Sequence, residues 1–153
     1  MDPNIKIDLL KTEYFKLQDF YEGFDTKVQT IKGWSATVSI AAITLGFSYK
    51  NPFIWLFAAL TAMVFWIMEA KWKMFQYCYA DRICEIENAF EKNLLDEITP
   101  IQIYSSWFKS WRSGKFKFQN IFFMKFVMIP YAYTIVLCLG LFFSQLFFYR
   151  FFS

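Results

Sequence analysis

The sequence has no histidine among its 153 residues, and only three cysteines and five glycines. Without histidine there is no Ser/His/Asp or Cys/His nucleophile, no HExxH zinc motif and no acid–base catalysis by imidazole. The cysteines, Cys78, Cys84 and Cys138, form no CxxC or other metal-ligand spacing. The glycines form neither a GxGxxG fingerprint nor a Walker loop. We therefore predict that the protein is not an enzyme and has no catalytic residue, metal site or cofactor.

Charge is missing from three long stretches of the chain. Residues 33–49, 51–68 and 126–149 contain no charged side chain and are 17, 18 and 24 residues long. About 20 apolar residues of helix cross the hydrocarbon core of a bilayer, where a helix satisfies its own backbone hydrogen bonds. Trp34 and Trp72 lie where interfacial aromatic side chains would extend the two shorter stretches. The predicted fold class is an all-α integral membrane protein with three transmembrane helices.

The basic residues predict the topology. Of the 16 Lys and Arg residues, five precede the first uncharged stretch and nine lie between the second and the third, so that only Lys50 and Arg150 fall elsewhere. The positive-inside rule then places the N-terminus and the middle segment in the cytoplasm and the C-terminus outside. Apolar sequence begins only at residue 33, so no cleavable signal peptide is expected. The predicted location is the bacterial inner membrane, as a multi-pass protein.

The segment before the first uncharged stretch has a heptad pattern. Its apolar residues follow one another at spacings of three and four: Ile7, Leu10, Tyr14, Leu17, Tyr21, Phe24, Val28 and Ile31. Such a seam predicts a helix that pairs with another helix. A helix lying flat on the membrane is the alternative, but the polar face is mixed in sign, whereas such helices favour a strongly basic one. We assign Leu10, Tyr14, Leu17, Tyr21, Phe24 and Val28 to oligomerisation of a cytoplasmic helical stalk.

A second helix is predicted to leave the membrane beside the first. The chain runs from Met68 to Asn93 without proline or glycine, and its apolar residues recur at heptad-compatible intervals. The connection at 49–52 is short, so the first and second spans are antiparallel neighbours. The expected organisation is an amphipathic heptad helix at 1–32, a transmembrane hairpin at 33–70, a cytoplasmic extension of the second span at 71–95, a basic and aromatic juxtamembrane segment at 96–121 and a third transmembrane helix at 122–150.

Small and hydroxylated residues in the spans indicate close helix packing. They recur at helical spacing as Ser35, Ala36, Ser39, Ala42 and Gly46 in the first span and as Ala58 and Ala62 in the second. Thr37, Thr44 and Ser48 add a hydroxylated stripe, which predicts either a narrow polar path in an oligomer or packing within one chain.

Glu69 is a further pore-lining candidate, since an ionisable residue at a span end repeats as a ring in a symmetric oligomer. Its ordinary alternative is snorkelling or pairing with Lys125. In the third span, Gln145 needs a polar partner or the outer interface.

The segment from Tyr104 to Phe118, YSSWFKSWRSGKFKF, contains four cations and no acidic residue. The cations alternate with aromatic rings, which suits a single-stranded oligonucleotide or a nucleotide, because phosphates meet Lys and Arg while bases stack on rings. The same composition suits an interfacial anchor on anionic lipid, just before the third span. From composition alone, the anchor is the favoured interpretation.

The plan of the chain consists of the charged heptad helix, the stretch IKGWSATVSIAAITLGF, the tight hairpin, the continuation FWIMEAKWKMFQY, the block IQIYSSWF and a last span. This plan resembles that of the small multi-span membrane effectors of bacterial anti-phage defence, and most of all the effector of Hailong-type systems. It implies a homo-oligomeric ion channel, a tetramer, held closed by a DNA oligomer that a companion nucleotidyltransferase makes. It also implies a set of ligand-binding candidates, namely Tyr104, Trp107, Lys109, Trp111, Arg112, Lys115 and Lys117.

The predicted function is an oligomeric membrane effector that forms an ion-conducting pore in anti-phage defence. A cytoplasmic anionic ligand, an oligonucleotide or nucleotide, would gate it, and its opening would depolarise the membrane and arrest growth. The alternative is a non-conducting scaffold or accessory subunit that anchors a cytoplasmic partner through its helical stalk. The expected partners are membrane lipid, further copies of the chain, the anionic ligand and the companion enzyme.

Overall fold

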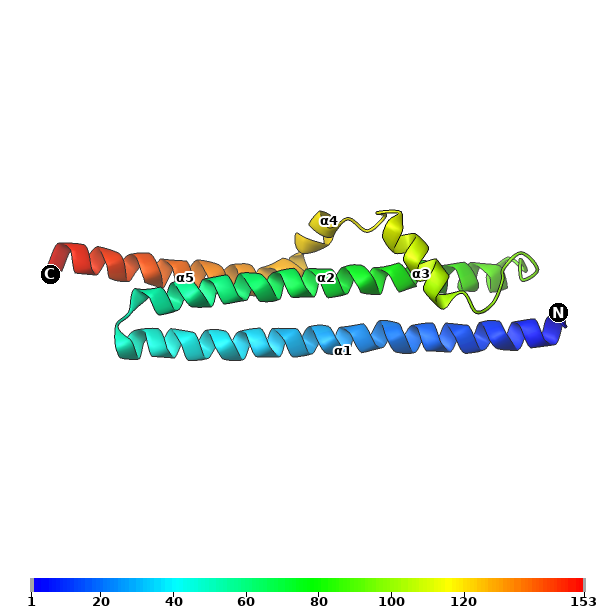
Figure 1. Ribbon diagram of the computed structural model, residues 1–153, viewed down its shortest axis with the longest axis horizontal. Coiled ribbons are helices and arrows are strands. Elements are labelled where there is room, and N and C mark those ends of the chain that lie inside the picture. The colour runs from blue at the N-terminus through cyan, green and yellow to red at the C-terminus, as the bar shows by residue number, and fades with distance from the viewer. Residues whose placement is uncertain (1, 153) are drawn as a thin grey trace. The chain divides into compact units, whose positions relative to one another are not determined.

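A computed structural model describes residues 2–152 and the side chains of residues 2–148. Arg150, which the topology prediction uses, has its side chain outside this range. Every regular element in the described part is a helix: α1 (Pro3–Tyr49), α2 (Pro52–Glu91), α3 (Ile103–Arg112), α4 (Phe118–Phe122) and α5 (Lys125–Phe152) (Figure 1). The predicted all-α class is confirmed for these residues.

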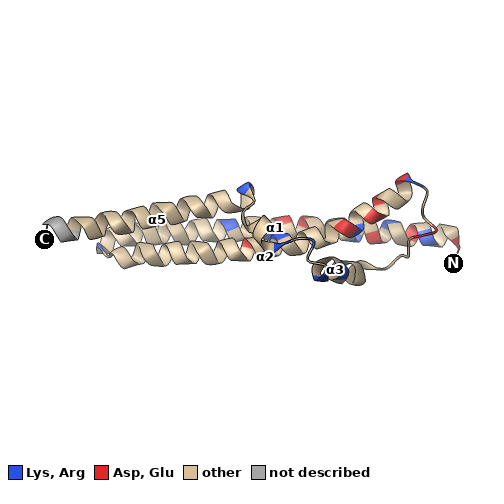
Figure 2. Ribbon diagram, turned by 90° about the horizontal axis from the view of Figure 1, so that it is seen from above, with Lys and Arg blue, Asp and Glu red and all other residues tan. Residues whose placement is uncertain are grey.

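The chain divides into two compact units. We call Met1–Lys27 with Trp72–Phe118 the charged unit, and Val28–Lys71 with Gln119–Ser153 the apolar unit. α1 and α2 each contribute residues to both units. Figure 2 shows the contrast in composition, because α5 carries almost no charge whereas the first half of α1 and the second half of α2 carry many charged residues.

A two-residue turn joins α1 to α2. Lys50 adopts a left-handed backbone conformation with φ of 52°, which ends α1. Asn51 then caps α2, since its Oδ1 accepts a hydrogen bond of 3.1 Å from the N–H of Phe53. Pro52 occupies the first helical position, where no N–H is needed. The short antiparallel connection expected at 49–52 is therefore confirmed.

The charged unit has a core in which α1 packs on α2. Leu10 and Leu17 of the heptad seam are buried against residues of α2 and of the following loop, namely Ile83, Ile86, Ala89 and Ile98. Tyr14 and Tyr21 are half-buried against the same cluster. The pairing of the two heptad segments within one chain is thus observed, and burial of these apolar side chains stabilises it.

The apolar unit is built on close contact between α1 and α2. Gly46 of α1 faces Trp55 of α2 so closely that a Cβ built on Gly46 would lie 2.1 Å from the indole Nε1. That Nε1 donates a 3.3 Å hydrogen bond to the carbonyl of Ile43. α5 joins this pair through Cys138, which is buried with Trp55, Ala58 and Ala59. Gly46, one of the small residues predicted to pack closely, therefore serves packing inside the chain.

Two of the described helices, α2 and α5, contain a stretch long and apolar enough to cross a membrane. Only 39% of that stretch in α2 and 17% in α5 is buried within the chain. The first span predicted at 33–49, in α1, is not one of the two, since seven of its 17 residues are Gly, Ser or Thr. The structure thus supports association with a membrane through two helices.

The segment after α2 differs in detail from the predicted boundaries. α2 ends at Glu91, and Asn93 and Ile101 have left-handed backbones in the loop that follows. The basic and aromatic segment predicted at 96–121 contains α3 and the short α4. The last long helix begins at Lys125 instead of residue 122, because α4 ends in a turn at Phe123 and Met124.

Candidate functional site

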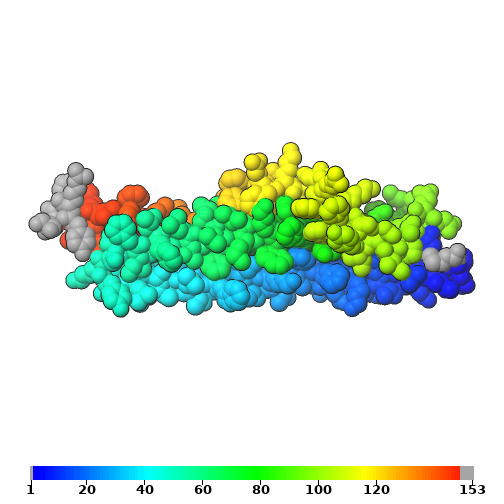
Figure 3. Space-filling view, viewed as in Figure 1, coloured from blue at the N-terminus to red at the C-terminus, as the bar shows by residue number. Residues whose placement is uncertain are grey.

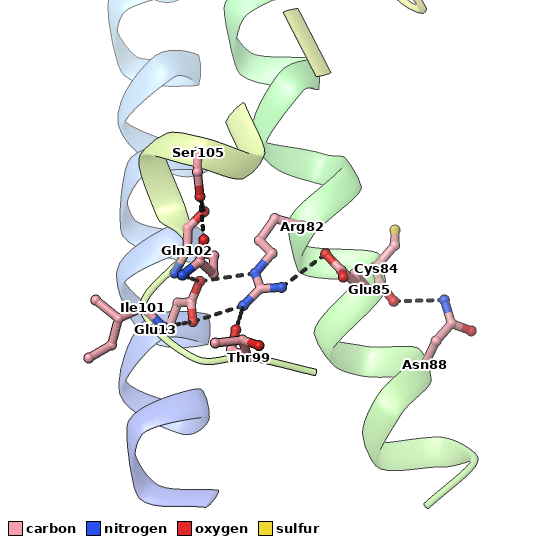
Figure 4. Close-up of polar contacts among 9 residues, drawn as sticks. All are labelled: Glu13, Arg82, Cys84, Glu85, Asn88, Thr99, Ile101, Gln102 and Ser105. Atoms are coloured by element: carbon pink, nitrogen blue, oxygen red, sulfur yellow. Dashed lines mark hydrogen bonds and ion pairs between the residues drawn. The ribbon is translucent and has the colours of Figure 1, made fainter. Parts of the chain in front are cut away.

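Glu13 and Arg82 form a buried ion pair in the charged unit (Figure 4). The Arg82 guanidinium donates to both carboxylate oxygens of Glu13, at 3.0 and 3.2 Å, and also to the carbonyl of Thr99 at 2.6 Å. Burial lowers the pKa of Arg82, but hydrogen bonds from the guanidinium to Glu13 and Glu85 outweigh it and raise the pKa above its ordinary value. The pair holds the loop before α3 against α1 and α2.

The same carboxylate fixes the start of α3. The N–H groups of Ile101 and Gln102 donate to Glu13 at 2.7 and 3.1 Å (Figure 4). Gln102 is the N-cap residue of α3 and makes no side-chain cap of its own. Ile101 has φ of 62°, which is strained for a β-branched residue. Glu13 therefore supplies from α1 the negative charge that a helix N-terminus favours, and it holds a strained loop in place.

α3 is fastened to α2 along one side. Ser110 donates a hydrogen bond to Asp81, and the indole N–H of Trp107 donates to the carbonyl of Phe75 at 3.1 Å. Lys115, just after α3, also pairs with Asp81 at 2.6 Å, and this hydrogen bond raises the pKa of Lys115. One of the four predicted phosphate contacts is thus already paired with a carboxylate.

The structure separates the remaining ligand-binding candidates. Lys109 lines a polar groove of about 410 Å³ together with Arg82 and two acidic residues, Glu85 and Glu97. The exposed rings of Tyr104 and Trp111 lie about 140° to 160° away from Lys109 around the helix, at 100° per residue. Arg112 and Lys117 are exposed. The basic and aromatic residues that alternate in the sequence therefore do not form one continuous surface.

Glu69, the pore-lining candidate, is fully buried between the three long helices of the apolar unit. Its carboxylate lies 3.2 Å from the Lys32 ammonium of α1 and accepts a 2.7 Å hydrogen bond from the Tyr131 hydroxyl of α5. The Lys32 ammonium also donates to the carbonyl of Phe126 at 3.1 Å. The expected pairing of Glu69 is seen, but with Lys32 instead of Lys125. A pore role for Glu69 stays a prediction.

Pro130 explains why Lys32 reaches α5. In a regular helix the N–H of residue 130 would bond the carbonyl of Phe126, and proline has no N–H to donate. Lys32 donates to the carbonyl that Pro130 leaves open. Sequence reasoning missed this contact, although the spacing of four between Phe126 and Pro130 shows that residue 130 donates no helical hydrogen bond to the Phe126 carbonyl.

The hydroxylated stripe of α1 is exposed in the apolar unit. The hydroxyls of Thr37, Thr44 and Ser48 each donate to a carbonyl four residues earlier, at 2.9 to 3.0 Å. Such a bond uses the hydroxyl proton and leaves acceptor capacity on the oxygen. In α5, the Gln145 side-chain Nε2 donates to the carbonyl of Lys50 at 2.7 Å, whereas its buried Oε1 accepts no hydrogen bond from the described residues, so the predicted need for a polar partner is met in part.

The residues assigned to oligomerisation fill space within the chain. Leu10 and Leu17 are buried in the charged unit and Val28 is buried in the apolar unit, whereas Tyr14, Tyr21 and Phe24 are half-buried. The fold of one chain uses these side chains, and a role between chains stays a prediction. Among the described residues, no group of three or more Cys, Asp or Glu side chains is placed to hold a metal ion.

No protein-family model, curated protein or solved structure matches the chain. The likeness to the membrane effectors of anti-phage defence therefore stays a prediction from the sequence plan. What the protein does must be inferred from the arrangement of its own residues.

Proposed function

We propose that the protein is an integral membrane effector whose copies assemble and conduct ions. The exterior of α5 supports the membrane location, because its large apolar side chains are mostly exposed; examples are Ile129, Tyr133, Val136, Phe143 and Phe147. A helix in the core of a water-soluble protein would bury these side chains, whereas lipid covers them at no cost.

In this proposal α1 supplies the third span. Residues 33–49 carry no charge and pack on the apolar part of α2 through Gly46 and Trp55. A helix bound this closely to a membrane span enters the bilayer with it, and its backbone hydrogen bonds are satisfied internally. The positive-inside rule then places the N-terminus and residues 71–124 in the cytoplasm, with the charged unit as the stalk.

The observation that carries conduction is the second small-residue face of α1. One face, with Ser35, Ser39 and Gly46, is buried within the chain. The face about 180° away around the helix is exposed and consists of Thr30, Gly33, Thr37, Ala41, Thr44 and Ser48. Hydroxyl groups form no hydrogen bonds with lipid tails. They can form them with a second chain or with water in a path. We infer that this face meets other copies and lines the path.

Control by a cytoplasmic anionic ligand, an oligonucleotide or nucleotide, is the remaining part of the proposal. Among the residues that the structure describes, Lys117 is an exposed cation of the 104–118 segment that has neither an acidic partner nor a place in the mixed-charge groove. The resemblance to anti-phage effectors supplies the biological setting. Loss of the ligand would open the path, depolarise the bacterial inner membrane and arrest growth.

The alternative function, a non-conducting scaffold, is favoured by one observation in the charged unit. A groove of about 360 Å³ lies between α1 and α2, lined by the apolar or aromatic side chains of Tyr14, Phe15, Ile86 and Phe90 and by Lys11 and Glu87. A helix of a cytoplasmic partner fits such a groove by its apolar face. A scaffold of this kind needs no path for ions.

A membrane-potential dye in cells that express the chain without a regulator separates the two functions. We expect depolarisation by the wild type and a smaller or altered leak in Thr44→Phe, which fills the exposed face of α1. Val136→Phe, on the exposed side of α5, is the matched control and should leak like the wild type. Full potential in cells whose membranes demonstrably contain the protein would overturn conduction and favour the scaffold.

A further inference from the structure

The exposed face of α3 carries a continuous ladder of aromatic rings. Tyr104, Phe108 and Trp111 are 73%, 37% and 46% exposed. The rings of Tyr104 and Phe108 lie 6.0 Å apart, and those of Phe108 and Trp111 lie 5.8 Å apart. Figure 3 shows the α3 segment, in yellow-green, at the surface. We call these three side chains the aromatic ladder.

The ladder is held in a fixed direction by the opposite side of α3. Ser110 is buried and bonds Asp81, and Trp107 bonds the carbonyl of Phe75. Glu13 fixes the first residues of the helix from α1. These three contacts hold α3 in an orientation that leaves the large apolar rings of Tyr104, Phe108 and Trp111 exposed.

Positive charge lies on one edge of the ladder. Arg112 follows Phe108 by four residues, which places it about 40° away around the helix. Lys109 lies on the far side, in the groove with Glu85 and Glu97. No acidic residue occurs between Tyr104 and Phe118. The surface that contains the ladder therefore combines aromatic rings with the Arg112 cation and has no carboxylate from its own segment.

We propose that the aromatic ladder docks on an anionic lipid surface, with the rings at headgroup level and Arg112 on lipid phosphates. Tyr and Trp favour the membrane interface because one end of each ring system is apolar and the other polar. Only residues 113–124 separate α3 from α5, whose sequence is apolar enough to cross a membrane. Such a short tether keeps α3 within about 40 Å of the start of α5, and hence at high effective concentration near the bilayer.

Lipid fits this surface better than a nucleic acid does. An oligonucleotide needs stacking rings and several phosphate contacts on one face. Lys109 lies on the groove side of α3 and Lys115 is paired with Asp81. Two of the four cations therefore do not contribute to the face that carries the ladder. A lipid surface needs only the rings and the nearby charge. The inference rests on the membrane location in the proposed function and holds whether or not the protein conducts ions.

Single-cysteine labelling of the full chain in lipid nanodiscs tests the proposal. Cys78, Cys84 and Cys138 are first replaced by serine. An environment-sensitive dye is then attached at Tyr104→Cys. The control carries the dye at Ser105→Cys, which is exposed next to Tyr104 in the sequence. We expect a blue-shifted dye at position 104 that is quenched by nitroxide lipids, more strongly in phosphatidylglycerol than in phosphatidylcholine discs. At position 105 the dye should stay accessible to a water-soluble quencher.

Charge variants refine the result. Arg112→Gln should weaken docking on anionic discs about fivefold, the effect of one cation at such a surface. Lys109→Gln, on the opposite side of α3, should leave docking unchanged, and size-exclusion profiles check that both variants fold. Equal water access at 104 and 105 in every disc would overturn the proposal. It would also be overturned if a single-stranded oligonucleotide, added to phosphatidylcholine discs, protected position 104 while anionic lipid did not.

Discussion

Glu13 accepts hydrogen bonds from four N–H groups in the charged unit: two on the Arg82 side chain and two in the backbone of Ile101 and Gln102. A carboxylate with this many charge-assisted and backbone donors recovers much of what it loses by leaving water. It links α1, α2 and the start of α3. Loss of Arg82 would leave the buried Glu13 carboxylate without its cation and with only the two backbone donors of Ile101 and Gln102.

We therefore expect Arg82→Met to destabilise the charged unit by about 3–5 kcal/mol, the usual cost of leaving a buried charge uncompensated. Glu85→Gln is the matched control, because Glu85 also pairs with Arg82 but is 55% exposed, so its loss should cost less than about 1 kcal/mol. Thermal unfolding in detergent, followed by circular dichroism, measures both. Equal melting temperatures for Arg82→Met and the wild type would contradict the role of this pair.

Lys32 and Glu69 offer a second test at single residues. Lys32→Met leaves the fully buried Glu69 without its cation and should lower stability by about 3–5 kcal/mol. The double variant Lys32→Met with Glu69→Met removes both charges and should recover most of this loss, because apolar residues of similar size often replace a buried ion pair at little cost. A double variant as unstable as the single one would show that the two charges do not act on each other.

At the scale of elements, the hairpin of α1 and α2 depends on a glycine. Gly46→Ala would place a methyl group 2.1 Å from the Trp55 indole nitrogen, so the helices must separate or the ring must turn. We expect a loss of about 1–3 kcal/mol, as for other overpacked sites. Gly140→Ala on α5 is the control, since nothing lies within 4 Å of a Cβ there. Melting temperatures should fall only for Gly46→Ala.

The helices, their pairing and the turn could be predicted from the sequence because each follows from a local pattern. The heptad spacing from Ile7 to Ile31 indicated the seam, and the absence of proline and glycine after Met68 indicated the long α2. Which residues form the long-range polar contacts could not be predicted in this way. Glu13 reaches residues 82, 101 and 102 only after the chain has folded back, and no spacing in the sequence encodes those distances.

The basic and aromatic segment shows the same limit. Its composition indicated rings and cations together, and periodicity alone did not show that Asp81 would take Lys115 or that Lys109 would turn toward acidic residues. Both facts depend on how α3 packs on α2. The sequence therefore predicts one set of ligand-binding candidates, whereas the structure places them on two sides of α3 and in the turn that follows it.

At the scale of the whole molecule, chemical labelling of the cysteines tests the predicted membrane topology. Cys84 is exposed, while burial, together with the nearby charge of Asp81, raises the pKa of Cys78 to about 11. A maleimide at pH 7 should therefore label Cys84 and leave Cys78 unmodified, since thiolate is the reactive form. In intact cells a membrane-impermeant maleimide should miss Cys84 as well, and permeabilisation should expose it. Labelling of Cys84 in intact cells would contradict a cytoplasmic charged unit.

Ion flux through liposomes that contain only the purified protein tests the central claim most directly. We expect the wild type to collapse a potassium gradient, and Thr44→Phe to reduce or change the flux because it fills the exposed face of α1. Val136→Phe should conduct like the wild type, which separates the path from the lipid-facing surface. Liposomes that hold correctly inserted wild-type protein and keep their gradient would contradict the account and leave the scaffold as the function.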